Sequence, residues 1–130
     1  MASSSNVRIL IVDDSAVWRA FLMEHLYDSG LGLVYVAYDG VQAVHKARTL
    51  QPDVILMDVS LPHKNGIEAA AEIRIAVPKA KIVFVSSNDD PHFRRAALAA
   101  GGSDYVLKSM AGHHLIGAIM AALRGGAGTA

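Results

Sequence analysis

Short apolar segments of strand type alternate along the chain with segments in which apolar residues recur every three or four positions. The strand-type segments are VRILIV, LVYVA, DVILM, KIVFV and DYVL. The helical spacing is clearest in three stripes, which are Trp18, Phe21, Leu22 and Leu26; Val41, Val44 and Ala47; and Leu115, Ile116, Ile119 and Leu123. The alternation predicts five β/α units.

Strands that are apolar on both faces are typical of a parallel sheet that helices cover on both sides. Glycine and proline residues fall at the expected joins between elements, where they end helices and shape turns. The pattern therefore predicts an α/β fold of the doubly wound kind, with five parallel strands and five helices.

Length and composition narrow the class of protein. At 130 residues, 52% of them hydrophobic, the chain suffices for one domain with a substantial core. Its 12 basic and 12 acidic residues cancel, which argues against direct binding to nucleic acid. It has no cysteine, the first residues do not resemble a signal peptide, and no apolar run is long enough to cross a bilayer. We expect a soluble, cytoplasmic protein with no membrane association.

The two ends differ in composition from the rest of the chain. The segments ASSSN and RGGAGTA are rich in small and polar residues, as disordered tails and linkers are. We expect a disordered N-terminal tail at residues 1–6, one domain at residues 7–124, and a C-terminal tail or truncated linker at residues 125–130.

Polar residues follow the predicted strands, at the edge of a parallel sheet where ligands gather. In chain order these residues are Asp13 and Asp14, Asp58, Ser86 and Ser87, and Lys108. Three carboxylates brought close together repel one another by several kcal/mol per pair at an effective dielectric constant of about 20. A hard divalent cation relieves that repulsion, and Mg²⁺ suits a site of few carboxylates, several waters and a phosphate. A single acid here would more simply be a helix cap, and Asp14 or Ser15 could cap the first helix.

The chain resembles the receiver domains of bacterial two-component response regulators over nearly its whole length. The resemblance rests on ILIVDDS, PDVILMDVSLPHKNGIEAAAEIR, KIVFVSS and GGSDYVLK, in this order and at this spacing. It implies a flavodoxin-like sheet with strand order 2-1-3-4-5.

The resemblance also implies the site residues. Asp58 would be the phosphoacceptor, and Asp13, Asp14 and Asp58 would bind Mg²⁺ together with the backbone carbonyl of Ser60. Lys108 would pair with the acyl phosphate. The hydroxyl and aromatic switch positions would be Ser86 and Tyr105.

Three positions leave questions open. Ser86 stands where threonine is commoner in the family, and it keeps the hydroxyl. Tyr105 could pack in the core as an ordinary strand aromatic instead of switching. Ser109 stands where many receivers have proline, so we expect a trans peptide bond before it. The missing proline, with EAAAEIR and LIGAIMAAL, resembles the subgroup linked to helix-turn-helix DNA-binding domains, and such an output domain is absent from this chain.

The resemblance implies a phosphorylation-dependent signalling switch and not a metabolic enzyme. Its partner would be a histidine kinase or a histidine phosphotransfer protein, and its only catalysis would be its own phosphorylation and slow dephosphorylation. A homodimer through the fourth helix, fifth strand and fifth helix is left open. Two other classes compete: a Mg²⁺-dependent phosphatase with an aspartyl nucleophile, and a flavodoxin-like cofactor binder. The first would need a D-x-D motif, and the second would not need the acids or Lys108.

Overall fold

The strands form one parallel sheet in the order β2-β1-β3-β4-β5. The structure is a computed structural model that describes residues 7–125. The strands are β1 (Val7–Val12), β2 (Gly32–Ala37), β3 (Val54–Met57), β4 (Lys81–Ser86) and β5 (Gly102–Leu107). All four neighbouring pairs are parallel, with one irregularity between Ile82 and Val83 in the β4–β5 pairing. The predicted fold class and strand order are confirmed.

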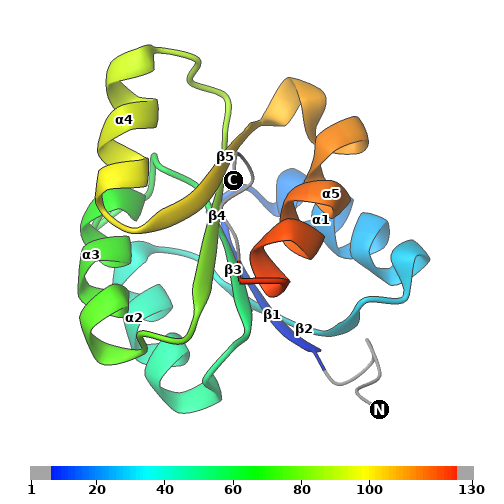
Figure 1. Ribbon diagram of the computed structural model, residues 1–130, viewed down its shortest axis with the longest axis horizontal. Coiled ribbons are helices and arrows are strands. Elements are labelled where there is room, and N and C mark those ends of the chain that lie inside the picture. The colour runs from blue at the N-terminus through cyan, green and yellow to red at the C-terminus, as the bar shows by residue number, and fades with distance from the viewer. Residues whose placement is uncertain (1–6, 126–130) are drawn as a thin grey trace.

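Helices connect the strands and cover both faces of the sheet (Figure 1). They are α1 (Ala16–Ser29), α2 (Gly40–Leu50), α3 (Gly66–Ala76), α4 (Pro91–Ala99) and α5 (Ala111–Leu123), and a 3₁₀ turn at Lys108–Met110 precedes α5. A polar side chain caps the start of each of the first four helices by accepting a backbone N–H bond; these residues are Ser15, Asp39, Asn65 and Asp90. The cap fixes the residue at which each of these four helices begins.

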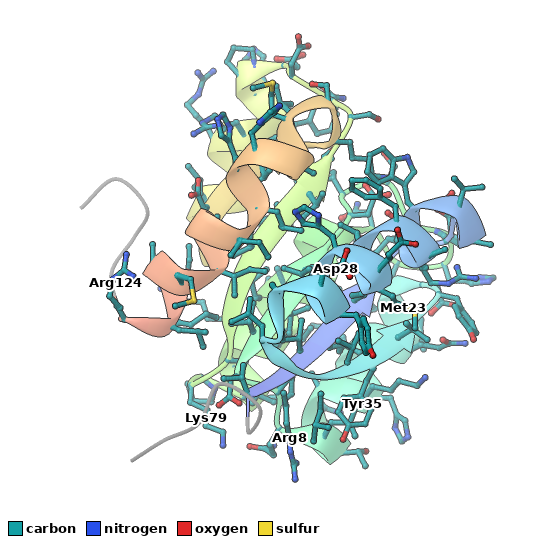
Figure 2. All side chains as sticks on the ribbon, turned by 90° about the vertical axis from the view of Figure 1, so that its right-hand side faces the viewer. Arg8, Met23, Asp28, Tyr35, Lys79 and Arg124 are labelled. Carbon is teal, nitrogen blue, oxygen red and sulfur yellow. The ribbon has the colours of Figure 1, made fainter. Side chains whose placement is uncertain are left out.

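The two faces of the sheet carry separate hydrophobic cores. Helices α2, α3 and α4 cover one face, while α1 and α5 cover the other (Figure 1). Figure 2 looks onto the second face, where α1 and α5 lie over the strands. Strands β1, β3 and β4 lie inside the sheet, and almost all their residues are buried. Because these buried strands are closely packed, they fix the positions of the residues that follow them.

Two residues of the expected apolar stripes are not in the core. Phe21 is 42% exposed and Val41 is 53% exposed, because each lies at the rim of its helix's buried stripe, beside Leu22 and Val44. The expectation of strands buried on both faces is also wrong for β2, where Leu33 is 51% exposed. Strand β2 is at the sheet edge and pairs with β1 alone, so its outer side has no neighbouring strand.

Three other expectations concern the backbone and the ends of the chain. The described residues contain no cis peptide bond, which agrees with the trans bond expected before Ser109. Within residues 7–125, none of the helices is long and apolar enough to cross a bilayer. The expected tails lie outside the described residues, apart from Gly125.

Candidate functional site

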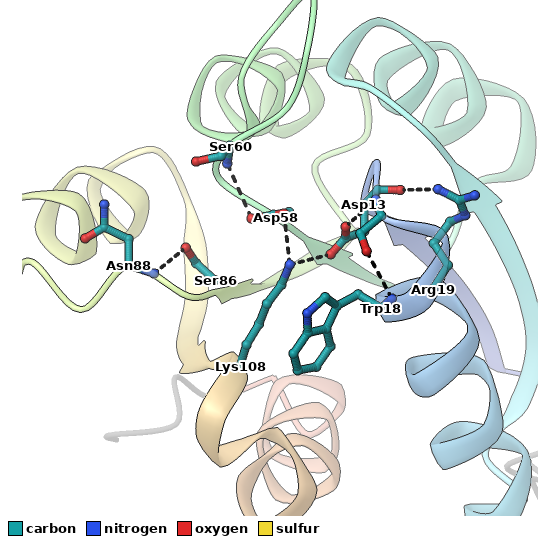
Figure 3. Close-up of polar contacts among 9 residues, drawn as sticks. Asp13, Trp18, Arg19, Asp58, Ser60, Ser86, Asn88 and Lys108 are labelled. Carbon is teal, nitrogen blue, oxygen red and sulfur yellow. Dashed lines mark hydrogen bonds and ion pairs between the residues drawn. The ribbon is translucent and has the colours of Figure 1, made fainter.

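The strand-end residues meet at one edge of the sheet, on the ends of β1, β3, β4 and β5 (Figure 3). Asp13 follows β1, Asp58 follows β3, Ser86 ends β4, and Lys108 follows β5. Asp13, Asp58 and Ser86 are buried, with 1%, 6% and 1% of their surfaces exposed. Polar groups this deeply buried require partners, and every described buried side-chain nitrogen or oxygen has one.

Lys108 is the centre of the charged part of this site. Its Nζ lies 2.9 Å from Oδ2 of Asp13 and 3.2 Å from Oδ2 of Asp58 (Figure 3). All three side chains are at least nine-tenths buried. One ammonium therefore bridges two carboxylates that are 45 residues apart in the sequence, and it offsets only part of their combined charge.

Asp58 carries a raised pKa. Burial is the main cause, because it penalises the charged form; the positive charge of Lys108 opposes the rise, and the neighbouring Asp13 carboxylate adds to it. The pKa of Lys108 is raised as well: burial works against its charged form, but the bonds to Asp13 and Asp58 outweigh that effect. Burial is therefore the chief cost of ionising Asp58, and its pairing with Lys108 offsets part of that cost.

The acids could hold a divalent cation. One carboxylate oxygen from each of Asp13, Asp14 and Asp58 lies within 4.8 Å of the other two. Asp14 is exposed, while Oδ1 of Asp13 accepts from the Ser15 N–H at 2.9 Å and Oδ2 pairs with Lys108. A set of carboxylate oxygens open to water on one side suits Mg²⁺, which binds through few protein oxygens and keeps several waters.

The loop that follows β3 is held tightly against the site. Ser60 is exposed, and its N–H donates to Oδ1 of Asp58 at 3.3 Å. Gly66 begins α3 so close to β3 that a Cβ at this position would lie 1.9 Å from the backbone carbonyl oxygen of Asp58. Asn65 and Glu68 form a reciprocal capping box around that start. Glycine is therefore required beneath Asp58, where the sequence pattern predicted only a turn.

A second group of contacts leads away from the acids through neutral groups. The Ser86 hydroxyl oxygen accepts the N–H of Asn88 at 3.1 Å, and the Tyr105 hydroxyl donates to the Asn88 carbonyl at 2.7 Å. Tyr105 is 4% exposed, so its ring packs in the core in this conformation. Arg94 of α4 donates to the Tyr105 carbonyl at 3.2 Å. These bonds connect the Ser86 hydroxyl with α4.

Arg19 is a site residue that sequence reasoning missed. Its guanidinium donates to the backbone carbonyl of Asp13 at 2.9 Å (Figure 3). The guanidinium also lies 4.4 Å from the centre of the Tyr38 ring. A positive charge in the first turn of a helix opposes the helix dipole, which favours negative charge at that end. That unfavourable placement, five residues after Asp14, was a signal available in the sequence.

The comparison with known protein families agrees with this geometry. Residues 9–120 match the family described as "Response regulator receiver domain". The chain belongs to this family.

Individual relatives and solved structures show the same likeness. The chemotaxis protein CheY of Thermotoga maritima is 37% identical over 78% of this chain and 84% of its own length. The transcriptional regulatory protein LnrK of Bacillus subtilis is 32% identical over 92% of this chain and 55% of its own length. Among solved structures, a LuxR-family response regulator from Aurantimonas sp. SI85-9A1 has a TM-score of 0.88 at 34% identity, covering 95% of this chain and 89% of that one.

The relatives divide into short and long proteins. The chain spans most of the length of CheY but only about half of LnrK, and 28% of a protein-glutamate methylesterase/protein-glutamine glutaminase of Maricaulis maris. What they share with this chain is the receiver domain. The chain is therefore a phospho-accepting signalling switch of the two-component type, with the acid cluster of such a domain in place.

Proposed function

We propose that Asp58 accepts the phosphoryl group and that Lys108 holds it there. Support comes chiefly from the position of the Lys108 ammonium, which lies 3.2 Å from Oδ2 of Asp58, with both side chains at least nine-tenths buried. An ammonium at that position can pair with phosphoryl oxygens as readily as with a carboxylate. The proposed donor is a phosphohistidine of a histidine kinase or of a phosphotransfer protein.

In the proposed step, a carboxylate oxygen of Asp58 attacks phosphorus. A P–O bond forms, the P–N bond to the donor imidazole breaks, and its electron pair returns to the imidazole ring. Lys108 then exchanges part of its contact with Asp58 for contact with a phosphoryl oxygen. Beyond this transfer and the slow hydrolysis of the acyl phosphate, we propose no enzymatic activity for the chain.

We assign the metal site to Asp13, Asp14 and Asp58, with the Ser60 backbone carbonyl as a further ligand. Mg²⁺ bound there would supply positive charge to the transferring phosphoryl group. Both oxygens of Asp13 already accept contacts, from Ser15 and Lys108, whereas Asp14 is exposed. We therefore infer that Asp14 binds the ion directly and that Asp13 binds it through water.

Phosphorylation of the intact protein tests these assignments. Incubation with acetyl phosphate and Mg²⁺ should raise the intact mass by one phosphate, and Asp58→Asn should abolish the increase. Asp28→Asn is the matched control, because Asp28 is an exposed acid near the end of α1, and it should retain the increase. A wild-type protein without the added mass, or an Asp58→Asn variant with it, would contradict the proposal.

We further propose that the face formed by α4, β5 and α5 carries the response. The neutral bonds from Ser86 through Asn88 to Tyr105 end beside a surface groove of about 490 Å³, to which Arg94, Tyr105 and His114 contribute. A change in the contact of the Ser86 hydroxyl would alter the support of the Tyr105 ring, which stands at this groove. Beryllofluoride with Mg²⁺ should then shift the amide signals of Tyr105 and residues 91–101. Shifts restricted to residues in contact with Asp58 would contradict this assignment.

The remaining assignments concern the whole protein. We propose that residues 7–124 are the receiver domain, that the flanking residues are tails or a linker, and that the protein acts in the cytoplasm. The absence of cysteine is consistent with a reducing compartment. Relatives such as LnrK extend beyond the matched region, which supports a further output domain, such as a DNA-binding one, in some members of the family.

A further inference from the structure

The side chain of Trp18 lies against the charged centre of the site. The Lys108 Nζ is 5.0 Å from the centre of the Trp18 ring, and Figure 3 shows the indole beside the lysine and below Asp13. We propose that Trp18 is a positioning residue, whose ring keeps the Lys108 ammonium at the acids while that ammonium changes partners. The inference rests on the proposed phosphoryl transfer to Asp58, and it assigns a task to a residue outside the acid cluster.

The surroundings of Lys108 explain why a third partner matters. The ammonium has contacts with Asp13, Asp58 and the Trp18 ring, and its side chain is 9% exposed. Phosphoryl transfer obliges it to give up carboxylate contact and to take up phosphoryl oxygens. During that exchange Asp13 and the indole keep their places, and the indole attracts the ammonium without adding charge to the site. The face of an indole attracts a cation, and the attraction strengthens where water is excluded.

A neutral ring suits this position better than another acid would. The site already contains three carboxylates, and the pKa of Asp58 is raised by its burial and by the charge of Asp13. A fourth carboxylate would add to that repulsion, and an amide or hydroxyl would compete for the hydrogen bonds that the phosphoryl group needs. The indole face attracts the ammonium without either cost.

The backbone fixes the ring relative to Asp13. Oδ1 of Asp13 accepts the N–H of Ser15, and Oγ of Ser15 accepts the N–H of Trp18 at 3.3 Å as the cap of α1. The same carboxylate therefore binds Lys108 through Oδ2 and anchors the start of the helix that carries the ring. Phe21 supports the indole in an edge-to-face contact, with ring centres 5.1 Å apart.

Core packing by itself is the competing explanation for Trp18. The ring is partly buried and packs against the core on the α1 and α5 face. Packing requires volume, whereas attraction to an ammonium requires an aromatic face. Packing alone does not depend on the charge of Lys108, whereas attraction to an ammonium does, so a second variant without that charge separates the two explanations.

The first experiment measures the rate of phosphorylation by acetyl phosphate with Mg²⁺ in Trp18→Leu and Trp18→Phe. We expect Trp18→Leu to lower the rate constant at saturating acetyl phosphate by about threefold to tenfold, and Trp18→Phe to restore it to within about twofold of wild type. Tyr27→Leu is the matched control, since Tyr27 is an exposed aromatic residue of α1, and it should leave the rate unchanged. Equal rates in Trp18→Leu and wild type, or equal losses in both Trp18 variants, would overturn the inference.

The second experiment needs no phosphoryl transfer. Unfolding of the metal-free protein is compared for wild type, Trp18→Leu, Lys108→Met and the double variant. If the ring acts on the ammonium, the effect of Trp18→Leu on the unfolding constant should shrink by about threefold or more when Lys108 is already methionine. Additive effects would overturn the inference even if Asp58 is phosphorylated normally. Failure of the wild-type protein to gain phosphate would instead overturn the proposed function, so the two failures are distinguishable.

Discussion

The two halves of the sheet edge differ in how their residues are held. In the charged half, Asp13, Asp58 and Lys108 are buried and joined by ion pairs, and the acids outnumber the lysine. In the neutral half, Ser86, Asn88 and Tyr105 are linked by single hydrogen bonds between uncharged groups. A neutral hydrogen bond contributes only about 1 kcal/mol net, so this half can rearrange at small cost.

In the proposed function, the charged half carries the phosphoryl chemistry and the neutral half carries the response. The charged half holds three carboxylates against one ammonium, a charge excess that a bound cation can offset, and burial in this half raises the pKa of Asp58. The neutral half starts at the adjoining strand β4 and leads to α4 and the groove. Four predictions test this division, and the first concerns the backbone under the charged half.

Gly66→Ala should have the largest effect. An added Cβ would lie 1.9 Å from the carbonyl oxygen of Asp58, so either α3 or the end of β3 must move. We expect a loss of about 2–4 kcal/mol in the free energy of unfolding, with loss of phosphorylation. Gly117→Ala is the control, because a Cβ there meets nothing within 4 Å in the interior of α5; it should stabilise the fold by about 0.5–1 kcal/mol. Chemical denaturation of both variants measures the contrast, and a Gly66→Ala protein as stable as wild type would contradict it.

Asp14→Ala should weaken Mg²⁺ binding by about tenfold or more, and Asp13→Ala by less. Asp14 is exposed to solvent, whereas both oxygens of Asp13 already accept contacts. Titration calorimetry without phosphate compares the two variants with wild type. Equal losses would show that both carboxylates bind the ion in the same way.

Asp58→Asn should raise the thermal midpoint of the metal-free protein by several degrees. For a domain of this size, each kcal/mol gained in the free energy of unfolding raises the midpoint by roughly 4 °C. Because the folded state raises the pKa of Asp58, the folded protein holds this proton more tightly than the unfolded chain does. That contribution to stability is complete below the ordinary value of 3.8 and is lost as pH rises through the raised pKa. Thermal melts across this pH range should show a decline in wild type that Asp58→Asn reduces. An identical decline in both proteins would mean that Asp58 is not its source.

Tyr105→Phe should have the smallest effect on stability, about 0.5–1 kcal/mol, because it removes one neutral hydrogen bond, to the Asn88 carbonyl. Phosphorylation of Asp58 should proceed normally, while the amide shifts of residues 91–101 induced by beryllofluoride should decrease. Mass measurement and amide spectra of the same sample check both statements. If Tyr105→Phe slowed phosphorylation, the neutral half would affect the chemistry at Asp58, and the division between the two halves would be wrong.

Much of the fold could be predicted because its signals are local. The apolar segments of β1, β3 and β4 are nearly continuous, as in strands buried on both faces, and the residues after them meet by the topology of parallel sheets. The strand order came from the resemblance and not from the pattern, which does not specify neighbours. The errors at Phe21, Val41 and β2 share one cause: hydrophobicity indicates which residues can be buried, while exposure depends on what lies opposite them.

The sequence by itself determined the five strands and helices, the polar caps and the presence of three acids, a hydroxyl and a lysine at one sheet edge. The tertiary structure decided which partners they take: Lys108 between Asp13 and Asp58, the Trp18 ring beside it, and Gly66 against the Asp58 carbonyl. Periodicity and turn chemistry act over a few residues, and they are visible in the sequence. Contacts at a few ångströms between distant segments depend on the register of the strands and the tilt of the helices, which only the packed cores fix.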